Sequence, residues 1–183
     1  MNTSNTRDRI LDALQEILIR EGYSSVTLEA VARAASVSKG GLLYHFPSKA
    51  AMLTGLIERL SVLAEQEFRE AVEGEEGVVR VFLRTSLPQS SEERELYWAI
   101  IAALRGQDDM PPEAFAHVQD LFDRWRRLLH EELEDPVLAE IILRAGDGLY
   151  LSDIVGLPSA DPALLQAVID RLAAESDRVR RVR

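Results

Sequence analysis

Between Ala30 and Ile57 the sequence contains no carboxylate, although it places three cationic side chains there, Arg33, Lys39 and Lys49. The chain has 31 Asp and Glu residues in 183, so an even distribution would put about five in these 28 positions. A surface that approaches the phosphates of a nucleic acid gains by excluding carboxylates, because each one would repel the polyanion. The window therefore favours binding to a nucleic-acid backbone.

Two short helices joined by a tight turn are predicted to position these cations. Thr27 can cap the first helix and Ser38 the second, and Ser36 lies in the turn between them. The apolar residues that recur at helical spacing would face the core: Leu28, Val31, Ala32, Ala35, Val37, Leu42 and Phe46. The outer face of the second helix is then formed by Lys39, Gly40, Gly41, Leu43, Tyr44 and His45. This layout is that of a DNA-reading helix-turn-helix.

The stretch VTLEAVARAASVSKGGLLYHFPSKAAML, preceded by RDRILDALQEILIREGY, closely resembles the N-terminal domain of the tetracycline-repressor (TetR) family of bacterial transcriptional regulators. The resemblance covers about the first 55 to 60 residues and is most specific at SKGGLLYHFPSK. Three positions depart from the usual pattern: Ser36 stands where Gly is usual, Leu43 where an aromatic is common, and Gly41 where Thr is common. The resemblance does not extend visibly into the remaining two thirds of the chain.

The DNA-binding residues expected from this motif are Ser25, Thr27, Ser38, Lys39, Gly40, Gly41, Leu43, Tyr44, His45 and Lys49. The resemblance implies that Lys39 reaches a base edge or a phosphate, and that Tyr44, His45 and Lys49 bind phosphates. Ser25 and Thr27 can donate to the DNA backbone beside a helix N-terminus. Leu43 has no hydrogen-bonding group, so it can meet only a thymine methyl or the groove wall.

Gly40 and Gly41 stand at the start of the second helix, where each costs roughly 1 kcal/mol of helix stability against Ala. A close approach of the backbone to DNA would explain both glycines. The alternative is that they occupy a frayed first turn.

The net charge of −10 is unequally distributed along the chain. Residues 1–60 carry +1, whereas residues 61–183 carry −11. The acidic part should therefore lie away from the nucleic acid, which indicates two functional regions. We predict a helix-turn-helix domain over residues 1–50 and an effector-binding and dimerisation domain over residues 51–183, linked by one long helix from about 48 to 72.

Helical periodicity predicts an all-α fold of about nine helices. The first has an apolar stripe that ends before Gly22: Ile10, Leu11, Leu14, Ile17 and Leu18. Asp135-Pro136 and Asp161-Pro162 are cap-plus-proline starts for the last two helices. The stretch LYWAIIAAL, residues 96–104, carries no charge, so its helix is expected to run through the middle of a C-terminal bundle.

Composition excludes several classes of protein. The chain has no cysteine, so it has neither disulfides nor a cysteine-ligated zinc. No apolar run approaches the ~20 residues that span a bilayer, and the first residues lack the core of a signal peptide. A cytoplasmic location is expected.

Aromatic residues on the central helices of the C-terminal region are more often core than pocket on general grounds. The resemblance favours a pocket, because TetR regulators usually bind a small effector within this bundle. Arg105 and Asp147 interrupt apolar runs; each can fix a polar group of a ligand or serve as a helix-end charge or internal ion pair. The expected pocket residues are Tyr97, Trp98, Ile101, Arg105, Phe122, Trp125 and Asp147.

Residues 137–155 are apolar on more than one helix face, and Gly146 and Gly148 would let a second helix approach closely. A monomer would leave part of this surface exposed, and the resemblance implies a dimer. The expected interface residues are Leu143, Gly146, Tyr150, Ile154, Leu165 and Ile169.

Together with these patterns, the TetR resemblance implies a homodimeric repressor that a small-molecule effector releases from a palindromic operator. The alternative is a DNA-binding regulator of the same fold that has no small ligand and is controlled by a protein partner or by abundance. An all-α enzyme is the remote alternative, since the S-x-x-K pattern of Ser36 to Lys39 lies in the turn without companion motifs. Neither metal-ligand spacing nor a phosphate-binding glycine loop is present, so no catalytic residue, metal or cofactor is expected.

Overall fold

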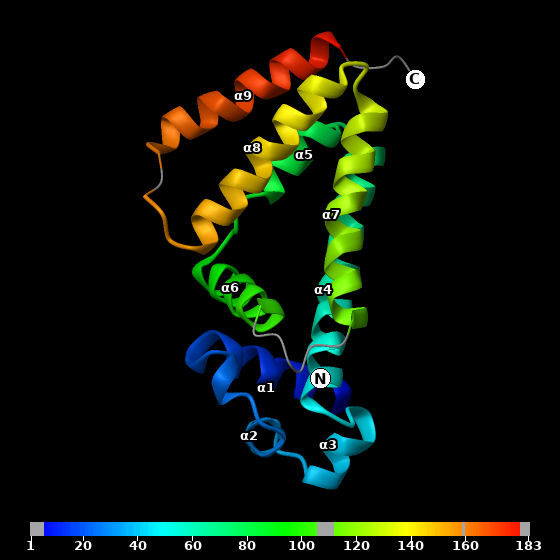
Figure 1. The fold of residues 1–183 in the computed structure, drawn as a ribbon, viewed down its shortest axis with the longest axis vertical. Helices are drawn as coiled ribbons and strands as arrows, with labels where there is room; N and C mark the ends of the chain where they lie inside the picture. Colours follow the sequence, from blue (N-terminus) through cyan, green and yellow to red (C-terminus); the bar gives the residue numbers. More distant parts are fainter. Residues whose placement is uncertain (1–5, 106–111, 159, 180–183) are drawn as a thin grey trace. The chain divides into compact units, whose positions relative to one another are not determined.

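The computed structural model describes residues 6–105, 112–158 and 160–179, which form helices and short connections (Figure 1). The described α-helices are α1 (Thr6–Glu21), α2 (Leu28–Ala34), α3 (Lys39–His45), α4 (Lys49–Glu73), α5 (Val78–Thr85), α6 (Ser91–Arg105), α7 (Pro112–Glu132), α8 (Pro136–Ile154) and α9 (Pro162–Arg178). A 3₁₀ turn, η1 (Tyr23–Ser25), lies between α1 and α2. For the part of the chain that the structure describes, the predicted all-α fold of about nine helices is confirmed. Among the described residues, none of the helices is both long and apolar enough to span a membrane.

Helix boundaries follow the local signals in the sequence. Gly22 ends α1 with a φ of 78°, a conformation that glycine adopts without a steric penalty. The Asp135 side chain accepts from the backbone N–H groups two and three residues on, at 2.9 and 3.1 Å, and so caps α8. Asp161 caps α9 in the same way at 2.9 and 3.3 Å. Both predicted helix starts are therefore confirmed.

The chain divides into two compact units. The first contains Met1–Ser61 and Ser91–Val118, and the second contains Val62–Ser90 and Gln119–Arg183. Helices α4 and α7 each have residues in both units. Our prediction divides the chain at a single point after residue 50, whereas each of these units combines two separate segments. The predicted boundary stays a prediction.

The core of the first unit holds α3 in place. The predicted stripe of α1 is buried there, together with Val31 and Ala32 of α2 and Leu42 of α3. Residues from the first half of α4 close this core: Met52, Leu53, Leu56 and Ile57. Burial of this many aliphatic side chains is the main free-energy source that fixes the helix-turn-helix.

Helix α6 packs differently from our prediction. Its residues Leu96, Ala99 and Ile100 are buried in the same core as α1, in the first unit. Trp98 on the same helix is 46% exposed. The prediction that this helix runs through the middle of the C-terminal bundle is wrong, because charge-free composition indicates burial without indicating the partner.

The second unit is built around an aromatic cluster. The Trp125 ring of α7 lies 4.8 Å from the Phe68 ring of α4 and 5.3 Å from the Phe82 ring of α5, measured between centroids. Such tilted aromatic pairs add to the free energy of apolar burial. Ile142 and Leu143 of α8 are buried in the same cluster, so one face of α8 is committed to the interior of its own chain.

Candidate nucleic-acid interface

The turn between α2 and α3 is fixed by backbone and side-chain hydrogen bonds. Oγ1 of Thr27 accepts from the Ala30 N–H at 3.1 Å, and Oγ of Ser38 accepts from the Gly41 N–H at 3.0 Å. Both predicted caps are thus present. Ser36 has a φ of 54°, in the left-handed region that favours glycine. The turn therefore has the left-handed backbone conformation that glycine adopts easily, although serine occupies the position.

Helix α3 presents one face to its core and the other outward. Leu42 and Phe46 are buried at 0% and 3% exposure, four residues apart. The opposite face carries Tyr44, which is 86% exposed, and Leu43, which is 37% exposed. Lys39 is exposed as well. Of the predicted outer face, Lys39, Gly40, Leu43 and Tyr44 are thus exposed, whereas Gly41 and His45 are half-buried.

The Lys39 ammonium is paired with a carboxylate of the preceding helix. Its Nζ lies 2.6 Å from Oε1 of Glu29, and both side chains are largely exposed. The hydrogen bond from Lys39 lowers the pKa of the Glu29 carboxyl below its ordinary value. Glu29 therefore remains ionised at neutral pH, and its negative charge lies directly beside the predicted base-reading lysine.

Lys49 makes its contacts with the connection between α1 and α2. Its Nζ donates to the backbone carbonyl of Tyr23 at 3.0 Å and stands 3.6 Å from the centroid of the Tyr23 ring. This cation–π contact and hydrogen bond join the first residue of α4 to η1. An ammonium has three N–H donors, so a phosphate contact by Lys49 is compatible with the carbonyl bond.

The two hydroxyl groups near the start of α2 differ in what they can donate. Oγ of Ser25 already donates to the carbonyl of Glu21 at 3.2 Å, so in this arrangement it offers a phosphate only acceptor lone pairs. Thr27 uses its oxygen as an acceptor in the helix cap, and its hydroxyl proton can still be donated. Thr27 therefore fits the predicted role, donation of a hydrogen bond to the DNA backbone, better than Ser25.

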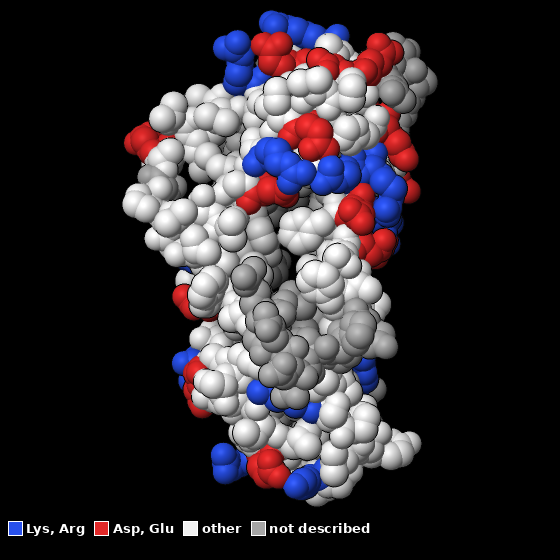
Figure 2. Space-filling model, in the orientation of Figure 1, with Lys and Arg blue, Asp and Glu red and all other residues white. Residues whose placement is uncertain are grey.

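Figure 2 shows one face of the molecule with its charged side chains coloured. At the end formed by α2 and α3, a small acidic patch lies between two basic patches. In the second unit acidic and basic groups lie next to one another, for example Arg84 with Glu70 and Glu76, at 2.7 and 3.2 Å.

The residues predicted to line an effector pocket are divided between the two units. Tyr97, Trp98 and Ile101 belong to the first, and the side chain of Arg105 lies outside the described residues. Phe122, Trp125 and Asp147 belong to the second unit. Trp125 is 7% exposed and is part of the aromatic core. The pocket as a whole stays a prediction.

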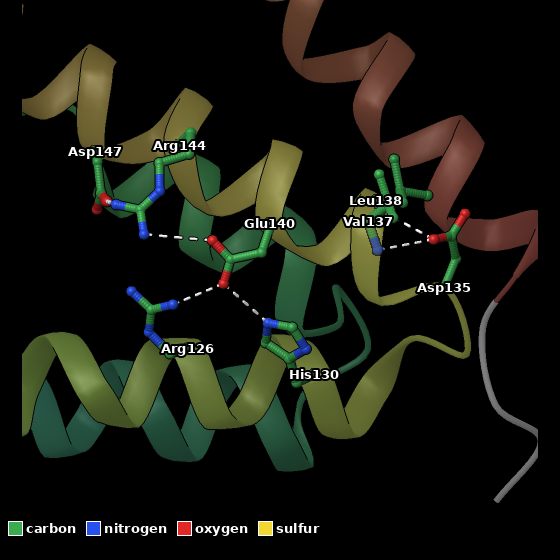
Figure 3. A network of polar contacts seen from close by, with 8 residues as sticks. All are labelled: Arg126, His130, Asp135, Val137, Leu138, Glu140, Arg144 and Asp147. Carbon is green, nitrogen blue, oxygen red and sulfur yellow. Dashed lines mark hydrogen bonds and ion pairs between the residues drawn. The ribbon is translucent and has the colours of Figure 1, made fainter.

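Asp147 takes part in a polar network on α7 and α8 (Figure 3). Its carboxylate lies 2.8 Å from a guanidinium nitrogen of Arg144, and Arg144 also contacts Glu140 at 3.3 Å. Glu140 in turn contacts Arg126 at 2.7 Å and His130 at 3.1 Å. Burial raises the pKa of Asp147, and Arg144 opposes that shift. Asp147 therefore forms an ion pair with Arg144 of the same helix, which is one of the alternatives that the sequence left open, and its contact with a ligand stays a prediction.

The structure places half of the predicted dimer residues inside the chain's own core. Leu143, Gly146 and Ile154 are buried, so they offer no surface to a second protomer. Tyr150, Leu165 and Ile169 are half-buried. The large apolar side chains exposed on α8, on its C-cap residue and on α9 are instead Val137, Ile141, Leu151, Val155, Leu164 and Val168.

Two family models match the chain over the regions just described. Residues 10–56, which contain α2 and α3, match the model of bacterial regulatory proteins of the tetR family. Residues 76–177, more than half of the chain, match the model described as the tetracyclin repressor-like C-terminal domain. The chain belongs to the TetR family. It is a DNA-binding transcriptional regulator with a helix-turn-helix, and not an enzyme.

Similarity to individual proteins agrees with this assignment. The TetR-family chain is 38% identical over 69 residues to the HTH-type transcriptional regulator UidR of Escherichia coli K12, which is 38% of this chain and 35% of UidR. It is 49% identical over 55 residues to the nucleoid occlusion factor SlmA of Aliivibrio fischeri, which is 30% of this chain and 28% of SlmA. The chain thus matches only about a third of the length of these curated relatives.

A solved structure resembles nearly the whole chain. The multidrug binding protein EbrR, complexed with malachite green, has a TM-score of 0.71 and 21% identity, and the match covers 92% of this chain and 98% of EbrR. At this identity the likeness establishes the fold.

Sequence reasoning missed two contacts of the helix-turn-helix region, Glu29 with Lys39 and Lys49 with Tyr23. A signal for the first was present, because Glu29 is the only carboxylate between residues 22 and 57. No sequence pattern indicated the contact of Lys49 with Tyr23, since every residue has a backbone carbonyl that can accept a hydrogen bond.

Proposed function

We propose that this TetR-family regulator is a homodimeric repressor, released from a palindromic operator by a small-molecule effector. The observation that carries the proposal is the outer face of α3, which is anchored by Leu42 and Phe46 and displays Lys39, Leu43 and Tyr44. A helix of this kind enters the major groove with its N-terminal residues at the base edges. A repressor bound at the operator would block other proteins from binding the same DNA.

Within that face, residues take different roles. Lys39 stands at the N-terminus of α3, so it is assigned to a base edge, where guanine offers two acceptors. Tyr44 and His45 lie at the other end of α3 and are assigned to phosphates together with Lys49. Leu43 is assigned to a thymine methyl or the groove wall. Among the described residues, a β-carbon added to Gly40 would meet no atom within 4 Å beyond its chain neighbours and the adjacent α3 backbone, and this open space supports a close approach of DNA to the α3 backbone.

The exposed apolar stripe on α8 supports a dimer. Val137, Ile141, Leu151 and Val155 are between 40% and 66% exposed, and their spacing with Arg144 and Gly148 follows one face of the helix. Leu164 and Val168 on α9 are likewise exposed, at 60% and 41%. Pairing such stripes from two protomers would bury them symmetrically. The proposed interface therefore replaces the buried residues predicted from the sequence.

Effector control is proposed through α4, because this single helix of 25 residues has one end in the core that anchors α3 and the other in the aromatic core. A ligand that changes the position of α4 would change the separation of the two reading helices. Coupling between sites is typically about 1–3 kcal/mol, enough to change operator affinity severalfold or more. EbrR was solved with malachite green bound, which supports a ligand in this fold.

The second candidate is a regulator without a small ligand, controlled by a protein partner or by abundance. The observation in its favour is the close packing around Trp125, whose ring contacts Phe68 and Phe82. A thermal-shift screen separates the candidates, since a ligand that binds the folded state raises its melting temperature. Tryptophan fluorescence reports the same event.

The central experiment is selection of bound DNA from a random library with the full chain. The expected result is a palindrome with half-sites about one helical turn apart. Lys49→Ala should then weaken binding to every sequence by a similar factor and reduce the salt slope by about one per protomer. Lys39→Ala should relax one position of each half-site. Failure to enrich any sequence, or variants that bind like the parent, would refute helix α3 as the reading element.

A further inference from the structure

Glu29 brings a carboxylate to the start of the reading helix α3. It is the second residue of α2 and Lys39 is the first residue of α3, and their charged atoms lie 2.6 Å apart. Both side chains are more than half exposed, at 63% for Glu29 and 58% for Lys39. The pair therefore lies on the outer surface beside α3, which the proposed function assigns to DNA, within a 36-residue stretch that has no other carboxylate.

An exposed ion pair of this kind contributes little to folding, and a carboxylate in the first turn of α2 adds only a modest favourable interaction with the helix dipole. Its electrostatic effect on DNA binding is expected to be larger, because the proposed function places DNA against the N-terminus of α3, where the pair lies. When Lys39 moves to a phosphate, it leaves Glu29 unpaired beside a polyanion, and this repulsion weakens the contact. The carboxylate thus penalises the sequence-independent use of Lys39.

The base-reading use of Lys39 is penalised less. An ammonium has three N–H donors, so Lys39 can keep its bond to Glu29 and still donate to the O6 and N7 acceptors of a guanine in the major groove. Specificity is the difference between the affinities for operator and for random DNA. A group that weakens binding to random DNA therefore raises specificity as effectively as a new contact with the operator.

We propose that Glu29 is a positioning residue that sets operator specificity by holding the Lys39 ammonium for a base edge and withholding it from phosphates. This inference rests on the proposed operator recognition by α3. It assigns to Glu29 a role in discrimination between operator and random DNA, and none in the strength of binding to DNA in general.

The test compares the parent with Glu29→Gln, which removes the charge and keeps the shape. Titrations on the selected operator and on a scrambled duplex of the same length, across several salt concentrations, give both affinities and both salt slopes. Affinity for the scrambled duplex should rise by roughly threefold to tenfold, and its salt slope should steepen by about one per protomer. Operator affinity should change less, so the ratio of the two affinities should fall.

The matched control is Glu16→Gln on α1, which removes one negative charge from an exposed pair with Arg20. It should leave the affinity ratio unchanged. Library selection with Glu29→Gln should also lose preference at the same half-site position as Lys39→Gln, and the double variant should add little to either. A purely structural role of Glu29 would not change this preference.

Two results would overturn the inference. If Glu29→Gln raises both affinities equally, as simple charge repulsion would, the carboxylate has no role in selection. If the half-site preference of Glu29→Gln matches the parent, Glu29 does not act through Lys39. Failure of the parent to prefer any sequence is a separate outcome, which refutes the proposed function and this role with it.

Discussion

Gly146 of α8 lies against the Phe82 ring of α5 so closely that a β-carbon on the glycine would be 2.5 Å from Cζ of that ring and 2.7 Å from Oγ of Ser86. Phe82 is 5% exposed and packs on Trp125, so the ring cannot move away from the added carbon without disturbing the aromatic cluster. Gly146→Ala should therefore destabilise the fold by about 1–3 kcal/mol, although alanine is the better helix former. Urea unfolding measures this loss.

Gly148 is the matched control on the same helix. It is exposed, and among the described residues no atom outside its chain neighbours and the adjacent α8 backbone lies within 4 Å of a β-carbon placed there. Gly148→Ala should be neutral or should stabilise the chain by up to about 1 kcal/mol. A loss of stability that depends on protein concentration would instead identify Gly148 as a close contact between protomers.

Ser36 in the helix-turn-helix turn has a left-handed backbone, with a φ of 54°. This conformation costs a non-glycine residue about 1–2 kcal/mol, and glycine loses part of that gain through its more flexible unfolded state. Ser36→Gly should therefore raise the free energy of unfolding by up to about 1 kcal/mol. Ser36→Val should lower it, because a β-branched side chain fits the left-handed region poorly. Thermal unfolding of both variants tests the two signs.

Features set by neighbouring residues could be predicted from the sequence. The Asp135 and Asp161 caps depend on a side chain and the N–H groups two and three residues away, and the burial of Leu42 and Phe46 depends on helical spacing. The unusual turn at Ser36 was also expected, because the family pattern places glycine there. Local chemistry determines each of these features, so no knowledge of distant partners is needed.

Features set by distant partners could not be predicted. The α8 sequence is apolar on more than one face, and which face lies inward depends on the Phe82 ring and on the space that Gly146 leaves for it. The packing partner of α6 likewise depends on which part of the apolar α1 surface the other helices leave uncovered. The pairing of Glu29 with Lys39 requires the turn angle, which the sequence does not give quantitatively.

The exposed apolar stripe of α8 predicts that substitutions there disrupt dimer formation without unfolding the chain. Ile141→Arg or Leu151→Arg places a charge in the proposed dimer face but on a side chain that is 51% or 52% exposed in a single chain. Each variant should remain folded and sediment as a monomer. Binding to a full palindrome should then fall toward that of a single half-site, since the two reading helices are no longer joined.

Leu143→Arg is the control for that experiment. Leu143 is 3% exposed within its own chain, so a charge there would be buried without a partner and should unfold the chain, at a cost of several kcal/mol. Circular dichroism and sedimentation distinguish the two classes of variant. Stable dimers of both exposed-site variants would place the association surface elsewhere.

The network around Glu140 predicts two acid-dependent effects of opposite sign. The hydrogen bond with His130 lowers the pKa of Glu140, supported by Arg126 and Arg144 against the opposing effect of burial. Its ionised form therefore stabilises the fold at pH values above its ordinary pKa of 4.5, and this contribution disappears as the pH falls through the lowered value. Burial raises the pKa of Asp147, so ionised Asp147 opposes folding above its raised pKa, and acidification relieves that effect.

Glu140→Gln should therefore melt at a lower temperature than the parent at pH 7, and the difference should shrink as the pH approaches 3. Asp147→Asn should melt at the parent's temperature or slightly above it at pH 7, and any advantage should vanish over the same acid range. Melting curves of the three proteins between pH 3 and pH 7 give both trends in one series. If the two variants shift in the same direction at pH 7, the two carboxylates do not differ in the way that their contacts and burial require.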